Sequence, residues 1–357
     1  MRPALFPFGF LSLRLLAALL VLAATAGTGW GQTAPIRLRV IGGLADVSQY
    51  TEHEVPFWST RVPQLTAGVV HAEIAPFDRS GIRGQDMLRL MRLGVVSFGN
   101  VLLSLASAED PELDALNLPL LNRDLVSMRR SAAAWRPHLA EMLRDRYNLE
   151  LLGIFTYPAQ VVLCRGAFTG LEDLVGRRVR TSSVAQAELM TAVGAVPVVI
   201  PFAEIVPAMR DGVVNCAITG ALSASSIGMQ TVATHVSPLP INWGISVFAA
   251  NRNAWQALPD TIRRRLRDAL GDLQEEIWQA AERADVEGVA CMTGRQPCPT
   301  GPQGQLRQVQ DTTPEAARRG LLARVVVPGW VRRCGIGCVR SWNATLAPLA
   351  GLTAEAD

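Results

Sequence analysis

Short apolar runs alternate with helix-like segments along the first third of the chain. Residues 36–43 (IRLRVIGG) alternate like a strand, and VVHAEIA at 69–75 and VVSF at 95–98 are further strand-like runs. Between them, residues 50–66 and 85–93 place apolar side chains with helical spacing. Strands separated by connections long enough for a crossover favour a parallel sheet. The pattern therefore predicts a β-α-β-α-β unit of an α/β protein.

A second set of strand-like runs follows two helical stretches at 123–134 and 135–147. Near its end, residues 261–289 form one unbroken helical stretch with an apolar face that includes Leu266 and Leu270. The other elements are strands at 149–155, 160–164, 176–181, 196–200, 213–218 and 245–250, and helices at 184–193 and 203–211.

Two such sets in a chain of 357 residues are enough for two lobes around separate cores. We expect an α/β fold in which two lobes with mainly parallel sheets are joined by hinge strands and spanned by the long helix. Lobe I is assigned to residues 32–155 plus 240–275, and lobe II to residues 156–239 plus 276–357. This arrangement is typical of a binding protein that closes on its ligand.

The first 31 residues have the pattern of a secretory signal peptide. Arg2 and Arg14 precede an apolar stretch from Leu15 to Ala24, and small residues follow it. An uncleaved membrane anchor is the alternative, although the stretch is shorter than the roughly 20 residues that a spanning helix needs. We interpret residues 1–31 as a signal peptide and expect the mature chain in the periplasm.

The charge of the chain does not indicate a nucleic-acid partner. Its 34 basic residues face 31 acidic ones, for a formal net charge of +3, and all of the basic residues are arginines. No basic arm or patch stands out, so no nucleic acid is expected. Because lysine is absent throughout, the choice of arginine at any one position carries no information by itself.

Six cysteines form an even set in a chain that we expect to be exported, which favours disulfides. Cys164 and Cys216 each end a strand-like run, so a bond between them would join neighbouring strands. The other four allow two short loops or a crossed pair of bonds. A four-cysteine zinc site fits poorly, because the spacing is wrong and no histidine is near. We expect no metal and no cofactor. The four cysteines other than Cys164 and Cys216 are Cys291, Cys298, Cys334 and Cys338.

An arginine ends the predicted strand GRRVRT. Arg180 is followed by Ser183 and Gln186, which have the spacing of a helix N-terminal capping box. Ligands of open parallel sheets bind outside the carboxyl ends of the strands. A guanidinium and the amide groups of a helix N-terminus would together bind a carboxylate there. A solvated arginine at a strand end is the alternative interpretation.

The segment 171–220 resembles the solute-binding subunits of TRAP transporters of the dicarboxylate-binding (DctP) type. It contains DLVGRRVRTSS and then TAVGAVPVVIPFAEIVPAMRDGVVNCAITG, close to the family's DLxGxKxR and LGAxPV…EVYxALxxGxVDG patterns. RSGIRGQDMLRLMRLGVVSFG, LNLPLL and NRNAWQALPDTIRRRL occur in the family's order. The resemblance covers nearly the whole mature chain and implies a binding protein and not an enzyme.

The resemblance also implies a ligand site and partners. In this family an arginine at the position of Arg180 pairs with the carboxylate of an organic acid. Thr219 takes the place of a family asparagine, and Phe202 matches an apolar or aromatic site position. We expect a small carboxylate as ligand, TRAP membrane subunits as partners, and a monomer.

The chain departs from the family at positions that bear on the ligand. The aspartate and glycine of the family turn are Asn215 and Cys216. Sialate-binding members carry a second arginine where this chain has TYPAQ at 156–160, which disfavours sialate. With one confident cationic anchor and aromatic residues available, the preferred ligand is a carboxylate with an apolar or aromatic body.

Several other residues are candidate ligand contacts. Tyr157 and Trp243 lie near the predicted crossovers, and Asn100 follows a strand of lobe I. The alternative role of Tyr157 is a hinge contact, that of Trp243 is core packing, and that of Asn100 is a local turn. Gln49 is a candidate to close the cleft, and Arg165 a candidate second positive charge.

Two other functional classes remain as alternatives. An exported enzyme is one, but the chain has no Gly-x-Ser-x-Gly motif, and its four histidines are scattered. A binding protein that serves another importer or a sensor is the other. Gene neighbourhood would separate the importers, because TRAP binding proteins are typically encoded beside two membrane subunits.

Overall fold

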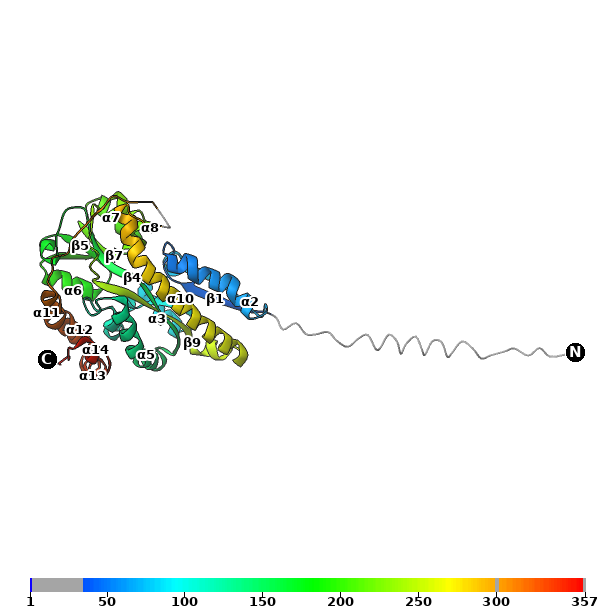
Figure 1. Ribbon diagram of the computed structural model, residues 1–357. Helices are drawn as coiled ribbons and strands as arrows, with labels where there is room; N and C mark the ends of the chain where they lie inside the picture. Colours follow the sequence, from blue (N-terminus) through cyan, green and yellow to red (C-terminus); the bar gives the residue numbers. More distant parts are fainter. Residues whose placement is uncertain (2–34, 299–301, 356–357) are drawn as a thin grey trace.

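The computed structural model describes residues 1, 35–298 and 302–355 (Figure 1). The predicted signal peptide, Met1 apart, lies outside the described residues. The fold is α/β, with a single sheet in the order β2-β1-β3-β9-β4-β7-β5-β6, to which β8 is added beside β4 and β10 beside β8. In the described part of the chain, no helix is both long enough and apolar enough to cross a bilayer.

One half of the sheet, called lobe I below, consists of β1 (Ile36–Gly42), β2 (Val70–Pro76) and β3 (Phe98–Leu102). β1 pairs in parallel with both β2 and β3, as the β-α-β-α-β pattern predicts. The strand predicted at 95–98 is wrong in its bounds. Val95 is 70% exposed and the strand begins only at Phe98, because Val95 belongs to the turn that follows helix α3.

The other half, called lobe II, consists of β5 (Arg178–Thr181), β6 (Val196–Val199) and β7 (Cys216–Gly220). β5 pairs in parallel with β6 and β7, and β7 pairs antiparallel with β4. The strand predicted at 213–218 starts later, because residues 213–215 form the turn after helix α7. Two short strands, β8 (His235–Val236) and β10 (Arg307–Gln308), extend the sheet past β4.

Two long antiparallel strands join the halves. β4 (Leu149–Cys164) is one strand of 16 residues where the sequence predicts two, and its partner is β9 (Asn242–Asn251). Their pairing shifts register twice, the second time between Thr156 and Ala159, where Pro158 lies. Such bulges bend a strand without ending it. The proline interrupts the apolar pattern, which is why the sequence suggests two strands.

The long helix α10 (Asp260–Thr293) contacts β4 and elements of both lobes. Figure 1 shows it running from α8 to the end of the molecule that carries α2. Gln274 Oε1 accepts a hydrogen bond from the Ile154 amide (2.8 Å), and Asp285 Oδ1 accepts one from the Ala159 amide (2.6 Å). Both amides lie beside register shifts of β4, so α10 satisfies backbone groups of the bent crossing strand.

Helix α5 (Leu125–Tyr147) packs on β4 and is continuous where the sequence predicts two stretches. Its start is capped by Asp124, whose carboxylate accepts a hydrogen bond from the Ser127 amide. Pro137 lies inside the helix without ending it. Among the C-terminal helices, α13 (Ile336–Thr345) and α14 (Ala347–Ala350) contact α5. Helix α12 (Val327–Cys334) contacts η5 (Pro111–Asn117) and α6 (Val184–Ala192).

Two apolar cores stabilise the molecule. The first lies between lobe I and α10 and includes Trp58, Phe248 and Leu270. The second extends from α5 along β4 into lobe II, and includes Trp135 and Leu189. The crossing strands therefore share packing with both lobes.

Three disulfides are present among the described residues. Cys164 and Cys216 are bonded and face each other across β4 and β7, which confirms the predicted link between strands. The others close short loops, Cys291 to Cys298 and Cys334 to Cys338.

The remaining helical elements are η1 (Gln49–Glu54), η2 (Phe57–Arg61), α2 (Val62–Leu65), η3 (Phe77–Arg79), η4 (Gly84–Asp86), α3 (Met87–Arg92), α4 (Leu103–Ala106), η5 (Pro111–Asn117), η6 (Leu171–Leu174), α6 (Val184–Ala192), η7 (Phe202–Glu204), α7 (Ile205–Arg210), α8 (Ala221–Ser226), η8 (Met229–Thr231), α9 (Arg252–Gln256), α11 (Glu315–Leu321), η9 (Leu322–Val326), α12 (Val327–Cys334), α13 (Ile336–Thr345) and α14 (Ala347–Ala350).

Candidate functional site

Arg180 is a buried cation on β5. Its side chain is held by two backbone acceptors, with Nε donating to Ile200 O and Nη1 donating to Ile218 O, both at 2.8 Å. The residue is only 4% exposed, and burial lowers its pKa to about 10, so it is still charged at neutral pH. No carboxylate of the described residues forms an ion pair with it. Two backbone carbonyls orient the guanidinium without neutralising it.

The helix that follows Arg180 begins as the sequence predicts, with one difference. Ser183 Oγ accepts a hydrogen bond from the Gln186 amide (3.1 Å). The return bond of a capping box goes instead to Ser182, whose amide donates to Gln186 Oε1 (2.8 Å). Gln186 Nε2 also donates to Asn242 Oδ1 on β9 (2.8 Å). The start of α6 is thereby tied to a crossing strand.

Thr219 and Phe202 lie in sequence next to the two carbonyls that hold Arg180. Thr219 follows Ile218 on β7 and is buried, and Phe202 lies two residues after Ile200 and is half-buried against the core. The structure therefore gathers these three predicted site residues at the carboxyl ends of the strands of lobe II.

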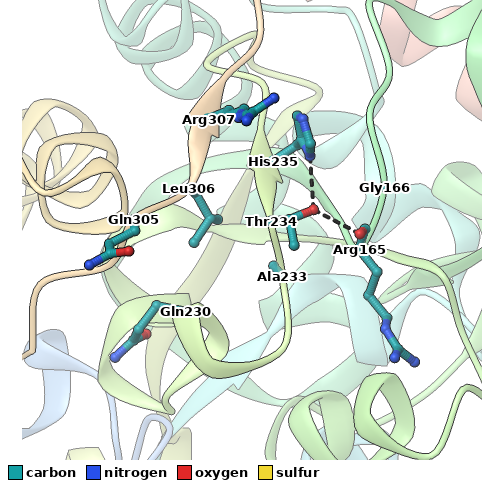
Figure 2. A pocket seen from close by; sticks show the side chains of 9 residues that line it. All are labelled: Arg165, Gly166, Gln230, Ala233, Thr234, His235, Gln305, Leu306 and Arg307. Carbon is teal, nitrogen blue, oxygen red and sulfur yellow. Dashed lines mark hydrogen bonds between the residues drawn. The ribbon is translucent and has the colours of Figure 1, made fainter.

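Arg165 lies apart from this group. It is exposed, donates through Nη1 to Met209 O (2.7 Å), and lines a separate open cavity of about 440 Å³ (Figure 2). Thr234 bridges the Arg165 carbonyl and His235 Nδ1 on the wall of this cavity. None of the other predicted site residues lines this cavity, and a second positive charge from Arg165 beside Arg180 stays a prediction. Its other lining residues are Gly166, Gln230, Ala233, Gln305, Leu306 and Arg307.

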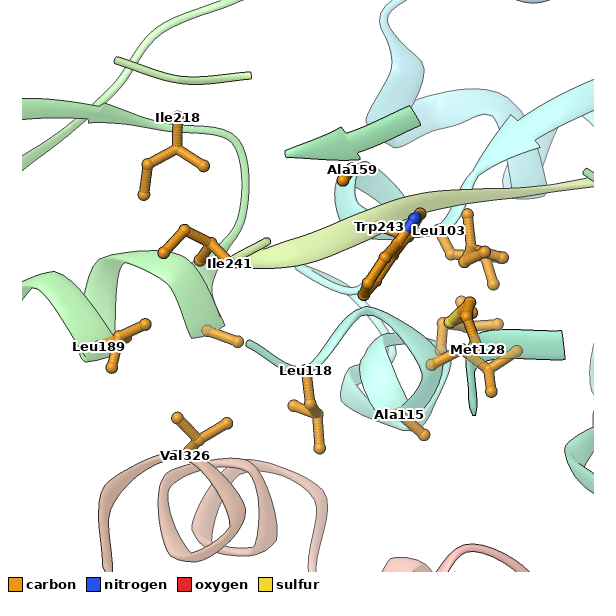
Figure 3. Close-up of a cluster of buried hydrophobic side chains, with 14 of the residues drawn as sticks. Leu103, Ala115, Leu118, Met128, Ala159, Leu189, Ile218, Ile241, Trp243 and Val326 are labelled. Carbon is orange, nitrogen blue, oxygen red and sulfur yellow. The ribbon is translucent and has the colours of Figure 1, made fainter. Parts of the chain in front are cut away.

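Trp243 lies on β9 with its ring in the apolar core. Figure 3 shows the indole near Leu103 and Ala159, among the side chains of the larger core. The residue is 2% exposed, and its indole N–H lies close enough to Asp285 of α10 for hydrogen bonding to oppose the rise in the pKa of that carboxyl. Core packing and Asp285 together account for the position of the indole.

Asn100 belongs to a buried polar cluster in lobe I that sequence reasoning missed. The cluster is centred on Glu54, which is 1% exposed. Glu54 Oε1 accepts hydrogen bonds from Asn100 Nδ2 (2.6 Å) and Gln49 Nε2 (2.7 Å), and Oε2 accepts one from the Gly43 amide (2.7 Å). Burial raises the pKa of Glu54, while the three hydrogen bonds oppose that rise. Below, these four residues are called the Glu54 cluster.

Tyr157 connects the crossing strands with the Glu54 cluster. Its hydroxyl is buried beside the Leu44 backbone and the Ser246 side chain. A Cβ atom on Gly43 would lie 2.9 Å from that hydroxyl and 3.3 Å from Glu54 Oε1, so only glycine fits between them. Burial and the charge of Glu54 both raise the pKa of Tyr157, while hydrogen bonding to Leu44 and Ser246 opposes that rise, and the phenol stays protonated. The side chain therefore places a protonated O–H at the hinge.

The described residues contain no group of three or more histidine, cysteine, aspartate or glutamate side chains arranged to hold a metal ion.

The family model that describes the bacterial extracellular solute-binding proteins of family 7 (DctP) matches residues 42–294. The chain belongs to this family. Its two-lobed α/β fold and the recognition of the sequence motifs are thereby confirmed.

Similar proteins include both a curated relative and solved structures. The outer membrane transporter protein TsaT of Comamonas testosteroni is 23% identical over 239 residues, which are 64% of this chain and 68% of that protein. The Bordetella pertussis receptor DctP7, which binds pyroglutamic acid, has a TM-score of 0.75 at 21% identity and covers 86% of this chain and 98% of its own. A TRAP solute-binding protein from Rhodoferax ferrireducens with bound malonate has a TM-score of 0.73 at 20% identity. The match covers 88% of this chain and 97% of that protein.

Proposed function

We propose that this family 7 protein is the extracytoplasmic receptor of a TRAP transporter and that it captures a small organic carboxylate between its lobes. The ligand's carboxylate pairs with Arg180, and Thr219, Phe202, Tyr157, Trp243 and Asn100 are the further proposed contacts. The receptor acts in the periplasm as a monomer, delivers the ligand to membrane subunits, and catalyses no reaction. Residues 32–155 plus 240–275 and residues 156–239 plus 276–357 are proposed to move as two lobes.

The observation that carries this proposal is the uncompensated charge of Arg180. A buried ion without a partner costs several kcal/mol, so native proteins pair such charges. Here the guanidinium is held in place by the Ile218 carbonyl of β7 and the Ile200 carbonyl just after β6. Arg180 lies three residues before Ser183, the N-cap of α6. A carboxylate bound there would receive charge-assisted hydrogen bonds from arginine and a favourable field from the helix N-terminus. The carboxylates bound by similar receptors support the same class of ligand.

The test is an Arg180→Ala substitution. Removal of the guanidinium leaves a bound carboxylate unpaired in a water-poor site, at a cost of roughly 2–5 kcal/mol. We expect affinity to fall at least about a hundredfold, as measured by calorimetric titration with the tightest acid found in a thermal-shift screen. Arg178→Ala is the matched control, because Arg178 lies two residues earlier on the same strand and is exposed, and its guanidinium donates to the Gly212 carbonyl (2.7 Å). Unchanged affinity in Arg180→Ala would contradict the proposal.

A further inference from the structure

We infer that the ligand carries, besides its carboxylate, an N–H or O–H donor at the opposite end, and that the Glu54 cluster together with Tyr157 recognises this donor. The inference rests on the proposed function, because it assigns the second end of a ligand whose first end is held by Arg180. It also excludes a second carboxylate at that end. Glu54 and Tyr157 then determine which organic acids the receptor accepts.

Glu54 is the counterpart of Arg180 in the other lobe. All three of its hydrogen bonds are donations to its oxygens, the pattern of an ionised carboxylate, and all three donors are neutral groups. No arginine or histidine of the described residues lies within ion-pair distance of it. Glu54 in lobe I and Arg180 in lobe II are thus buried groups of opposite charge, each without a counterion at ion-pair distance in the described part of the chain. A ligand with a carboxylate at one end and a donor at the other matches both.

An unsatisfied polar atom beside Glu54 points to the same chemistry. Gln49 Oε1 is buried and has no hydrogen-bond partner among the described residues, although buried polar groups normally have one. The amide nitrogen of Gln49 donates to Glu54, which fixes the orientation of the amide group. The other end is therefore the oxygen Oε1, which can only accept a hydrogen bond. The free acceptor calls for a donor that the described residues do not supply. A ligand N–H or O–H would provide it.

The cluster lies where the two lobes meet. Tyr157 belongs to the crossing strand β4, and a Cβ on Gly244 of β9 would lie 3.2 Å from its Cβ. At the start of η1, Ser226 Oγ of lobe II donates to Asp46 O of lobe I (2.7 Å). A cavity of about 110 Å³ opens between the same two elements. The helical turn that carries Gln49 and Glu54 therefore faces lobe II.

Glu54 also explains which acids are rejected. Two carboxylates at close range in a site of low dielectric cannot both stay ionised without a large cost, and protonating one of them at neutral pH is itself unfavourable. A dicarboxylate would place its second charge beside Glu54. Neutral donors such as a lactam N–H or a hydroxyl avoid this repulsion and satisfy the free acceptors.

The experiment compares acids that differ only in the donor. Matched pairs are L-pyroglutamate with its N-methyl derivative, and mandelate with phenylacetate; malonate, succinate and glutarate represent dicarboxylates. Calorimetric titration of the full mature chain should rank a donor-bearing monocarboxylate first, and removal of the donor should weaken binding at least tenfold. If the tightest acid of this panel is a dicarboxylate or lacks the donor, the inference is overturned.

Two variants then assign the selectivity to residues. Glu54→Gln keeps the size of the side chain and removes its charge, so the preference for the donor-bearing acid over glutarate should fall at least tenfold. Glu73→Gln on β2 of the same lobe is exposed and serves as the control. Tyr157→Phe should weaken only the donor-bearing acid. Because Tyr157→Phe removes one hydroxyl and leaves the ring in place, this variant remains informative even if Glu54→Gln fails to fold.

The outcomes separate the inference from the proposed function. If Arg180→Ala abolishes binding of every acid while Glu54→Gln and Tyr157→Phe leave the ranking unchanged, the function stands and the inference fails. If Arg180→Ala binds normally, the proposed function itself fails. If all three variants behave as expected, both ends of the ligand are assigned.

Discussion

At the residue scale, Asp114 is a buried carboxyl group without a close cation among the described residues, and its ionisation lowers the free energy of unfolding. Asp114 lies in η5 and is fully buried, and the Ala185 backbone is the hydrogen-bonding group that opposes the rise of its pKa. Arg333 approaches it only to 4.0 Å and forms closer contacts with Glu188, at 3.1 and 3.2 Å. Burial is the main cause that raises the pKa of Asp114 to about 7.

This shift predicts a pH dependence of stability. The folded-state pKa of Asp114 lies above its unfolded value, so folding takes up a proton between about pH 4 and pH 7. The free energy of unfolding should therefore fall as pH rises through this window. Asp114→Asn removes the charge, and we expect it to stabilise the protein by about 1–3 kcal/mol at pH 8 with little effect at pH 4. Urea unfolding at the two pH values checks this, and a gain of equal size at both would contradict it.

The contrast between Arg180 and Glu54 shows how far sequence patterns predict a site. Arg180 is recognisable because its neighbours in sequence, a strand end and a helix cap, already define its surroundings. Glu54 is an ordinary acid of a helical turn until Asn100, 46 residues away, and the Gly43 amide surround it. The signal was weak but present: the Gly-Gly pair after the first strand indicates a close approach of side chains. Its partner could not be predicted from local sequence.

At the scale of elements, the disulfide between β4 and β7 joins a crossing strand to lobe II. Cys164 and Cys216 are separated by 52 residues, and a loop of that length corresponds to about 4 kcal/mol in the chain-entropy model. The double substitution to alanine should lower the free energy of unfolding by up to about this amount. Ligand affinity should change little, because Arg180 is oriented by carbonyls farther along the strands.

The C-terminal disulfide provides the control for this prediction. Cys334 and Cys338 are only four residues apart, so the same model gives about 2 kcal/mol for their replacement. Chemical unfolding of both double variants, with ligand titration alongside, measures the difference. A loss of affinity in the Cys164/Cys216 variant under conditions where it is fully folded would show that the bond also positions the site.

A helix or strand of this protein is predictable from the sequence where one spacing of apolar residues holds along its whole length. The apolar face of α10 identifies that helix, although it extends beyond 261–289 at both ends. β4 was divided in the prediction because its bulge is stabilised from outside the strand, by the Asp285 carboxylate that accepts the Ala159 amide. α5 was divided although its hydrogen bonding runs past Pro137. In both cases tertiary contacts outweigh a local break in pattern.

At the scale of the whole molecule, the contact between Ser226 and Asp46 bears on closure. The single hydroxyl proton of Ser226 on α8 of lobe II has two acceptors, the Asp46 carbonyl just before η1 of lobe I (2.7 Å) and the Ser223 carbonyl of its own helix (2.8 Å). A ligand shifts a conformational equilibrium only through its differential affinity for the two states. A contact that exists only when the lobes are together therefore adds to the apparent affinity for every ligand.

Ser226→Ala should weaken binding of all acids by the same modest factor. One neutral hydrogen bond contributes about 1 kcal/mol, and because the Ser223 carbonyl competes for the same proton, the loss of affinity is at most about fivefold. The ranking of acids should not change, because neither Arg180 nor the Glu54 cluster is touched. Calorimetric titration measures the loss, and small-angle X-ray scattering should show a larger radius of gyration for the ligand-free variant. Ser59→Ala is the control, because the Ser59 hydroxyl bonds within its own helical segment. A changed ranking, or a loss limited to one acid, would mean that Ser226 contacts the ligand and does not act through closure.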